Sequence, residues 1–454
     1  MWSAAVRAVA ASCFRQRSIT TRALSTCGKR VVDMASRDGE LRVFIVAGEV
    51  SGDSIASRLM SSLKRISPFP VRFCGVGGTL MYQEGLKSLF LMEDISVMGI
   101  FELLPYLNRI RIQLNETIEA ALLFQAHVVV TVDSKGFSFR LLKSLKARYS
   151  EDEDSPICVH YVAPSFWAWK GGERRLGKLS EFVDYMLCIL PFEEEICRSN
   201  GLAAAYVGHP SLEDALYLNM ELDKLSNNWR VRGNGDAFRQ QHGIPPENKI
   251  ITLLPGSRLQ EVKRMLPIFS RTMELLNDSF SRLSVVIPVA RHQHVASHVE
   301  REIHSWSFPS ILISGKSLHQ RYDAFSASRA ALCTSGSAVM ELQLAGVPSV
   351  VAYRAHFLTE WLIRHRTKLR FISLPNILLD SEVIPEVLFH SCTCKNLAAT
   401  LSNIILDENS QRKQMDAAYN VFRQLCPQGL HSITENSCPS MSAASIILNV
   451  AKQK

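Results

Sequence analysis

Short runs rich in β-branched and other apolar residues recur along the chain from residue 41, and they alternate with stretches of helical character. This is the pattern of parallel strands joined by crossover helices, so it predicts an α/β fold. The predicted strands are 42–47, 71–76, 128–132, 158–162, 185–189, 249–254, 284–288, 311–314, 330–334 and 349–353.

These strands fall into two series, which predicts two Rossmann-like, doubly wound domains. The length of 454 residues agrees, because a single core stops growing at roughly 250–300 residues. Between the series the chain loses strand character and gathers polar, Asn and Gly residues. The predicted parts are an organelle transit peptide (1–38), an N-terminal domain (39–216), a linker (217–246), a C-terminal domain (247–425) and a C-terminal helical segment (426–454).

Composition narrows the class of protein. With 47% hydrophobic and 21% charged residues the chain is typical of a globular protein, and no run approaches the roughly 18 apolar residues of a membrane span. The net charge is +8, but residues 1–32 hold six Lys and Arg and no acid, which leaves +2 for the rest. A nucleic-acid partner is therefore not expected. The Arg-rich, acid-free start predicts a cleaved mitochondrial transit peptide, with a plastid as second choice.

The eleven cysteines are scattered singly, without the paired spacing of a zinc site or a disulfide framework. We expect reduced, mostly buried thiols and no metal site or cofactor.

Two turns in the second series suggest anion binding. Gly256, Ser257 and Arg258 follow a predicted strand and open a helix, so helix-start N–H groups and a guanidinium would face a phosphate. Ser335, Gly336 and Ser337 repeat the arrangement, and Glu341 lies one helical turn further, where it could accept hydrogen bonds from a ribose diol. The alternatives are ordinary turns and a surface carboxylate.

The turn after the first strand, G-E-V-S-G-D (48–53), lacks the G-x-G-x-x-G spacing of a dinucleotide loop. Its Glu49 would also meet a pyrophosphate with negative charge, which argues against a nicotinamide dehydrogenase. Glu49 could instead bind sugar hydroxyls or act as a base, with Ser51 beside it.

Residues 165–169 hold Phe166, Trp167 and Trp169 directly after a predicted strand. Such aromatic faces stack on sugar rings, and a hydrophobic plug is the alternative.

The stretch 132–137 places Asp133 where another apolar run stops. Asp133 is either a working acid or base, or a cap on the following helix.

Seven motifs in this order resemble lipid-A-disaccharide synthase: G-E-x-S-G-D, H-Y-V-x-P-S-x-W-A-W, L-P-F-E, V-G-H-P, L-P-G-S-R, S-G-S-A-x-x-E and S-L-P-N. The likeness extends from about residue 41 to 425. It implies a metal-independent, inverting glycosyltransferase of GT-B architecture that joins UDP-2,3-diacylglucosamine to 2,3-diacylglucosamine 1-phosphate by a β(1→6) bond and releases UDP.

The resemblance assigns roles to the residues above. It implies that the second domain binds UDP and the first binds the acceptor, with Ser51, Trp167 and Trp169 as candidate acceptor residues. The implied UDP-binding residues are Gly256, Ser257, Arg258, Ser335, Gly336, Ser337, Glu341 and Asn376. Arg258 would also stabilise charge on the departing UDP.

The chain departs from the family pattern at one place. The family shows D-x-P-D-F, whose second acid is the favoured base, and this chain has D-S-K-G-F (133–137). Because Gly136 cannot carry a proton, Asp133 or Glu49 remains as the base, or the chain is slow or inactive. The open alternatives are a UDP-sugar 2-epimerase and a non-catalytic nucleotide-sugar or lipid-binding protein.

Acylated substrates imply peripheral contact with a membrane surface. An unusually apolar stretch predicts an interfacial segment, with the alternative of a packed helix. Its predicted membrane-contact residues are Val97, Met98, Ile100, Phe101, Leu103 and Leu104. Residues 356–370, basic and with Trp361, could supply a second contact. The resemblance also allows a homodimer.

Overall fold

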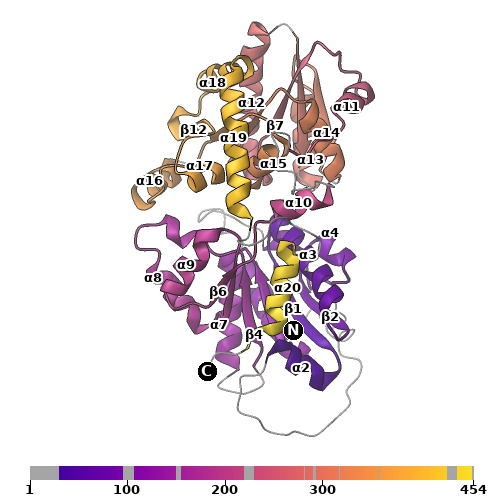
Figure 1. Cartoon of the computed structure of the whole chain (residues 1–454), viewed down its shortest axis with the longest axis vertical. Coiled ribbons are helices and arrows are strands. Elements are labelled where there is room, and N and C mark those ends of the chain that lie inside the picture. Colours follow the sequence, from indigo (N-terminus) through magenta and orange to yellow (C-terminus); the bar gives the residue numbers. More distant parts are fainter. Residues whose placement is uncertain are drawn as a thin grey trace. The chain divides into compact units, whose positions relative to one another are not determined.

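The computed structural model describes residues 30–95, 107–149, 155–218, 230–280, 282–289, 293–315, 317–355, 357–426 and 437–451. The chain forms two compact units. The first unit consists of the residues up to Pro210 together with the C-terminal segment that begins at Thr434. The second unit extends from Ser211 to Cys426. Each unit contains a parallel six-stranded sheet flanked by helices (Figure 1). The predicted α/β fold with two doubly wound domains is confirmed.

The sheet of the first unit has the order β2-β1-β3-β4-β5-β6. Its strands are β1 (Leu41–Ala47), β2 (Val71–Val76), β3 (Val128–Val132), β4 (Ile157–Tyr161), β5 (Tyr185–Cys188) and β6 (Ala204–Tyr206). The described helices of this unit are α2 (Val31–Asp38), α3 (Val50–Ile66), α4 (Thr79–Gln83), η1 (Met92–Asp94), α6 (Leu107–Phe124), α7 (Lys135–Arg148), η3 (Ser165–Ala168), α8 (Arg174–Gly177), η4 (Lys178–Glu181), α9 (Pro191–Ser199) and α20 (Pro439–Asn449).

Both faces of this sheet are buried. Along β1, Phe44 and Val46 join a core cluster with residues of α6 and α7, whereas Val43 and Ile45 join a second cluster with residues of α3 and α20. Successive residues of a strand point to opposite faces, so a strand covered on both sides is apolar at every position. This explains why the strands are recognisable in the sequence as continuous apolar runs.

The sheet of the second unit has the order β12-β11-β10-β7-β8-β9. Its strands are β7 (Lys249–Leu254), β8 (Leu283–Val289), β9 (Ser310–Ser314), β10 (Ala330–Cys333), β11 (Ser349–Tyr353) and β12 (Glu386–Leu388). The described helices are α10 (Ser211–Tyr217), α11 (Gly235–Gln241), α12 (Leu259–Ser279), α13 (Gln293–Ile303), α14 (Leu318–Ala327), α15 (Ser337–Ala345), α16 (Phe357–Arg366), α17 (Leu374–Leu379), η5 (Phe389–Ser391), α18 (Cys394–Leu406) and α19 (Glu408–Leu425).

The predicted linker, 217–246, differs from the structure. The division between the units falls at Pro210, and α11 belongs to the second unit. Phe238 of this helix is buried and packs with Ile250 and Ala324 on one face of the sheet. The polar, glycine-rich stretch therefore contains a short helix that belongs to the domain. This helix was not recognised from the sequence because a single buried aromatic, Phe238, anchors it. Residues 219–229 lie outside the described part of the chain.

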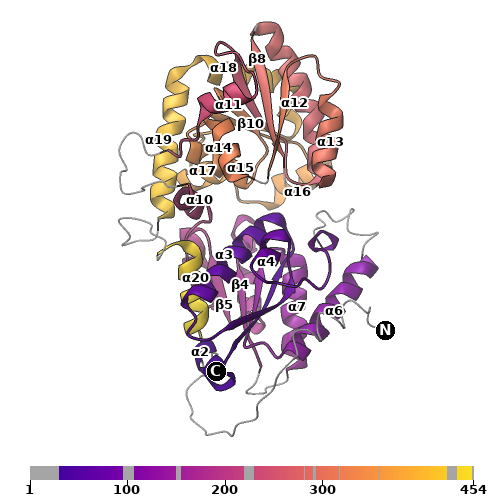
Figure 2. The same ribbon diagram turned by 90° about the vertical axis from the view of Figure 1, so that its right-hand side faces the viewer.

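The two ends of the described chain meet in the first unit. Helix α20 lies along α3 (Figure 2), and the backbone N–H of Val31 donates to Val450 O at 3.2 Å. Val31 and Ala35 of α2 are buried. The predicted transit peptide, 1–38, therefore overlaps a packed helix, and a presequence whose removal left this unit intact would end before Val31. Residues 1–29 lie outside the described chain.

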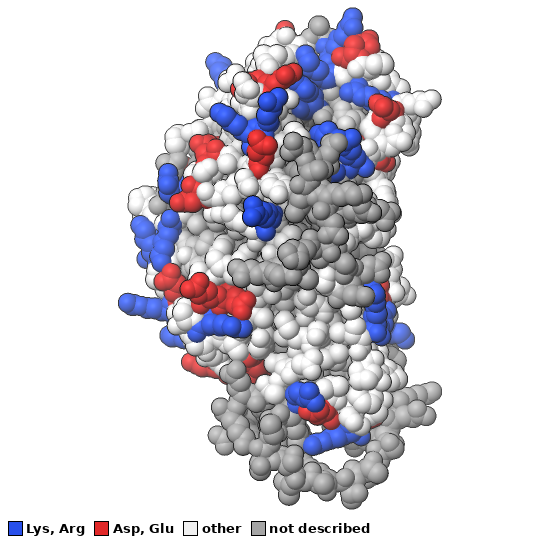
Figure 3. All heavy atoms as spheres, viewed as in Figure 1, with Lys and Arg blue, Asp and Glu red and all other residues white. Residues whose placement is uncertain are grey.

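The face of the molecule shown in Figure 3 agrees with the near-neutral charge predicted for the folded part. On the face shown in Figure 3, basic and acidic side chains are interspersed and form no extended patch of one sign among the described residues. No helix in the described ranges is long and apolar enough to cross a membrane. The nine cysteines that the structure describes are thiols and not members of a disulfide.

Candidate functional site

The two predicted anion turns lie side by side in the second unit. Strands β7 and β10 are paired in register, Cys333 opposite Leu254, so both turns leave the same carboxyl edge of the sheet. The backbone N–H of Thr334 donates to Leu254 O at 3.0 Å and joins the turns. Ligands of doubly wound sheets bind at this edge.

Each turn depends on a glycine in a left-handed conformation. Gly256 has φ 125° and Gly336 has φ 137°, a region that residues with a Cβ rarely enter. The space before Gly336 is open, because a Cβ placed there would meet no atom within 4 Å. A ligand can therefore approach the backbone closely at the start of α15.

A side chain occupies the place before Gly256. A Cβ on Gly256 would come within 2.3 Å of Glu261 Oε2, and the same oxygen accepts from the backbone N–H of Ser257 at 3.3 Å. Burial raises the pKa of Glu261, whereas Arg258 and hydrogen bonds from Ser257 and Thr334 lower it. The turn thus already binds a carboxylate, so it is suited to an anion. A phosphate that bound at this turn would have to replace the Glu261 carboxylate.

Glu341 is not a free surface carboxylate. Arg321, from α14, donates to Glu341 Oε2 at 2.5 Å, and both side chains are about four-fifths buried. The charge of Glu341 raises the pKa of Arg321, and Arg321 Nε is buried without a hydrogen-bond partner. Arg321 was missed by the sequence analysis, since an ion pair across 20 residues leaves no local signal.

Two of the predicted donor residues have structural partners instead. Asn376 is fully buried; its Nδ2 donates to Ile384 O and Glu386 Oε1, and its Oδ1 accepts from two backbone N–H groups. The hydroxyl of Ser335 donates to Ile372 O at 3.2 Å. All hydrogen-bonding positions of the Asn376 amide are used within the loop before β12, so the structure offers this side chain no route to a ligand.

In the first unit, Glu49 and Asp133 lie at one edge of the sheet. Ala47 of β1 pairs with Val132 of β3, so the turns that carry the two acids are adjacent. Gly48 makes this possible, because a Cβ there would lie 2.5 Å from Ser134 Oγ. Glu49 is half-buried as the N-cap residue of α3, and Ser51 is exposed.

Asp133 is not the cap of the following helix. The carbonyl oxygen of Ser134 accepts the first hydrogen bonds of α7, and Asp133 precedes this N-cap position. Its carboxylate accepts from the backbone N–H of Ser134 at 2.8 Å. Asp133, Ser134 and Val162 all have positive φ, and a β-branched residue with φ 77° is a rare exception. Strained backbone of this kind gathers at functional sites.

The predicted aromatic face is partly engaged within the fold. Trp167 Nε1 donates to Glu193 Oε1 at 3.1 Å, and its ring packs edge-on against Phe192. Glu193 is 3% exposed, and burial raises the pKa of its carboxyl to about 7. Trp169 is half-buried. Trp167 therefore anchors its turn, and Glu193 was not selected as a candidate because its partner lies 26 residues away.

The predicted membrane-contact residues between positions 97 and 104 lie outside the described chain. In the basic segment 356–370, which was predicted as a second membrane contact, Trp361 is 58% exposed and stacks on His365 of the same helix, α16. Among the described residues, no group of three or more His, Cys, Asp or Glu side chains could hold a metal ion.

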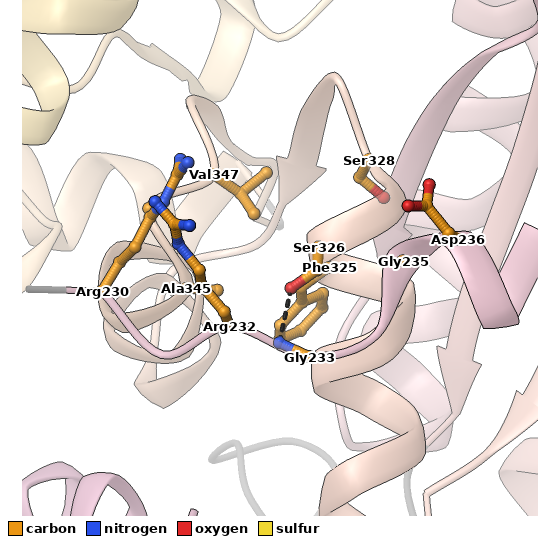
Figure 4. A pocket seen from close by; sticks show the side chains of 11 residues that line it. Arg230, Arg232, Gly233, Gly235, Asp236, Phe325, Ser326, Ser328, Ala345 and Val347 are labelled. Atoms are coloured by element: carbon orange, nitrogen blue, oxygen red, sulfur yellow. Dashed lines mark hydrogen bonds between the residues drawn. The ribbon is translucent and has the colours of Figure 1, made fainter. Parts of the chain in front are cut away.

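A cavity of about 260 Å³ lies at the opposite edge of the second sheet. Arg230 and Arg232 lie on one side of it and Asp236 on the other, and the N–H of Gly233 donates to Ser326 Oγ at 2.7 Å (Figure 4). Its walls precede β10 and β11, whereas the anion turns follow β7 and β10. None of these residues was predicted from the sequence to line a site, and the cavity is separate from the predicted donor site.

Three comparisons with known proteins bear on this arrangement. A family model described as Lipid-A-disaccharide synthetase matches residues 43–435. The "Probable lipid-A-disaccharide synthase, mitochondrial" of Arabidopsis thaliana is 54% identical over 436 residues, which cover 94% of each chain. The lipid-A-disaccharide synthase of Rhodospirillum centenum is 37% identical over 414 residues, 91% of this chain and 96% of the relative.

Among solved structures, a UDP-GlcNAc 2-epimerase from Neisseria meningitidis with bound UDP-GlcNAc aligns with 85% of this chain and 99% of its own. The TM-score is 0.54 and the identity 13%. This likeness concerns the fold alone, whereas the sequence similarity to the synthases extends through both units.

Proposed function

This chain belongs to the lipid-A-disaccharide synthetase family and is a glycosyltransferase of lipid A disaccharide synthesis, and from this premise we propose how its two sites divide the reaction. The second unit binds UDP-2,3-diacylglucosamine and the first binds 2,3-diacylglucosamine 1-phosphate. The observation that carries the proposal is the pair of adjacent glycine turns at the carboxyl edge of the second sheet, Gly256 and Gly336.

The donor is held at these turns. The backbone at Gly256, Ser257, Gly336 and Ser337, together with the Arg258 guanidinium, binds the diphosphate, which displaces the carboxylate of Glu261 from its seat. Glu341, fixed by Arg321, accepts hydrogen bonds from the ribose hydroxyls. Asn376 and Ser335 support the loops around this site.

The reaction is an in-line displacement. The acceptor O6 attacks C1 of the donor sugar, the bond from C1 to the UDP oxygen breaks, and UDP carries away the bonding pair. Asp133 accepts the proton of the attacking hydroxyl, with Glu49 as the second candidate. Arg258 and the helix-start N–H groups stabilise the charge that develops on UDP, and one such donor is worth about 3 kcal/mol of barrier, near a hundredfold in rate.

No metal is needed in this scheme. Charge on the leaving diphosphate is balanced by backbone N–H groups and a guanidinium, which require no bound cation. Turnover should therefore continue at an unchanged rate in the presence of EDTA, and restoration of lost activity by Mg²⁺ would contradict this part of the proposal.

The protein works at a membrane surface in mitochondria. The relative from Arabidopsis thaliana carries "mitochondrial" in its name, and the first 32 residues have the composition of a transit peptide. The acyl chains of both substrates keep them in a bilayer, where the apolar stretch around residues 97–104 and the exposed Trp361 of α16 make contact.

The test is an assay of the purified chain with both acylated sugars and detection of the disaccharide 1-phosphate and UDP. Formation of both products in equal amounts supports the proposal. UDP binding without product at high enzyme concentration would favour a non-catalytic binding protein. Conversion of UDP-N-acetylglucosamine without an acylated acceptor would favour an epimerase.

A further inference from the structure

Two cations lie around one aromatic ring at the carboxyl edge of the first sheet. Lys135 Nζ is 5.6 Å from the centroid of the Phe166 ring, and Arg175 Cζ is 5.9 Å from the same centroid. Lys135 begins α7 after β3, and Phe166 lies in η3 after β4. These strands are neighbours, and the backbone N–H of Asp133 donates to Tyr161 O at 2.9 Å, which holds the two strand ends together.

The two cations are close enough to repel each other. Partial burial lowers the pKa of Lys135, Arg175 lowers it further, and Asp133 raises it. In the described part of the chain Arg175 forms no ion pair with a carboxylate, and its guanidinium lies beside the Phe166 ring. Asp133 thus offsets one of the two positive charges, and the remaining excess favours a bound anion.

We propose that Lys135 and Arg175 form a subsite for the phosphate of the sugar-phosphate acceptor, beside the ring of Phe166. This inference rests on the proposed function, which places the acceptor in the first unit. A phosphate monoester carries up to two negative charges, and it suits the forked donors of an arginine together with the point charge of a lysine.

The subsite fits the position of Asp133. The acceptor presents two different groups, a hydroxyl that must lose a proton and a phosphate that must be held. Asp133 and Lys135 are separated by one residue at the same strand end, so one sugar ring can reach both. In the D-S-K-G-F segment, a lysine and a glycine stand where the family pattern has proline and aspartate. The exchange adds one positive charge and removes one negative charge next to the acceptor, which favours an anion there.

The experiment compares two acceptors, 2,3-diacylglucosamine 1-phosphate and the same lipid without phosphate, on the full chain and on Lys135→Gln, Arg175→Gln and the double variant. Loss of one charged hydrogen bond should raise KM for the phosphorylated acceptor about tenfold in each single variant. The KM for UDP-diacylglucosamine should stay within about twofold. Lys135→Arg should retain most of the preference for phosphate. Lys143→Gln, an exposed lysine on α7, is the matched control.

The acceptor without phosphate separates this role from a structural one. The double variant should use it as well as the full chain does, because no phosphate contact is lost. If the double variant keeps the full chain's preference for the phosphorylated acceptor, the subsite is wrong while the proposed function stands.

Binding decides the case in which the full chain forms no disaccharide at all. Glucosamine 1-phosphate, followed by its ³¹P resonance, should bind to the full chain and to Lys143→Gln and should bind at least tenfold more weakly to the double variant. Equal binding to all of these proteins would overturn the subsite, whatever the fate of the proposed reaction.

Discussion

Gly136 occupies the position where the family pattern D-x-P-D-F has its favoured base, an aspartate. The structure shows that the space around Gly136 is open. A Cβ on Gly136 would meet no atom within 4 Å, and the residue is exposed at the start of α7. The position can therefore accept a side chain without disturbing the fold. Its glycine removes an acid from the site and leaves Asp133 as the nearest carboxylate along the chain.

We expect Gly136→Asp to raise kcat about tenfold or more, because a positioned general base contributes a factor of 10²–10⁴ in many enzymes. The variant places a carboxylate three residues beyond Asp133. Disaccharide formation at saturating substrates is the measurement.

Asp133→Asn should lower kcat with little change in the KM for the UDP-sugar. Unchanged kinetics in Asp133→Asn would remove Asp133 from the mechanism.

Glu193 should make the stability of the first unit depend on pH. Burial raises the pKa of its carboxyl from the ordinary 4.5 to about 7 in the folded state. The folded state then binds the extra proton between these values, so the contribution is complete below about pH 4.5 and is lost as the pH rises towards 7. The loss amounts to up to about 3 kcal/mol.

The measurement is the free energy of unfolding at pH 5 and pH 8 for the full chain and for Glu193→Gln. The full chain should lose more stability than the variant over this interval, because glutamine does not titrate. Gln also keeps an acceptor for Trp167 Nε1, which now bonds to Glu193 at 3.1 Å. Equal pH dependence in the two proteins would mean that Glu193 is ionised throughout.

Arg321 should act on nucleotide affinity through Glu341, since the two form a partly buried ion pair. Arg321→Met leaves Glu341 charged without its partner and free to turn away from a ribose. We expect UDP to bind about tenfold more weakly and 2′-deoxy-UDP to be affected less, because it lacks one of the hydroxyls. Isothermal titration with both nucleotides tests this. Arg301→Gln, on the last turn of α13, is the control, and an equal loss for both nucleotides would contradict a role at the ribose.

At the scale of elements, the strands were predicted well because most of them are buried on both faces. All ten predicted strands exist, with bounds that differ by one residue or less. The predicted strand 158–162 ends at Tyr161 because Val162 turns to positive φ. Strands β6 and β12 were missed, and both are three-residue strands at the edge of a sheet. Three residues are too few to form a recognisable apolar run.

Helix α20 is an element whose partner is invisible in the sequence. It packs on α3 across more than 370 residues, with Ile447 fully buried and Ser62 Oγ 2.8 Å from Ser440 Oγ. Ile447→Ala should therefore destabilise the first unit by about 3 kcal/mol, as expected for a large apolar residue removed from a core. Chemical denaturation monitors this loss. Ser445→Ala, on the exposed side of the same helix, should change stability by less than about 0.5 kcal/mol.

At the scale of the whole molecule, the chain leaves the first unit at Pro210, forms the second, and returns to the first for its last helix. The first unit is therefore built from both ends of the chain. Helix α2 contributes Val31 and Ala35 to its interior, and His127 Nε2 lies 3.0 Å from Asp38 Oδ2 at the end of this helix.

This arrangement predicts the limit of the presequence. Removal of residues 1–29 should leave the melting temperature within about 1 °C, whereas removal of residues 1–38 deletes α2 and should lower it by several degrees. Thermal unfolding of the two truncated chains is the comparison. Sequencing of the N-terminus of the protein from mitochondria should find a start ahead of Val31, and retention of Met1 would contradict the transit peptide.

The sequence by itself determined the class of fold and the family, because buried parallel strands are apolar throughout and because short turns such as L-P-G-S-R keep their residues together. It also placed Gly256, Gly336 and Asp133 at strand ends, where register then brings them to one edge of each sheet. Only the tertiary structure decided which side chains are free to act. Asn376 and Trp167 are hydrogen-bonded to partners in other elements of the fold, Glu261 occupies the anion-binding turn, and Arg321 fixes Glu341. Most of these contacts join side chains of different elements, and no local pattern encodes a contact that exists only after the chain has folded.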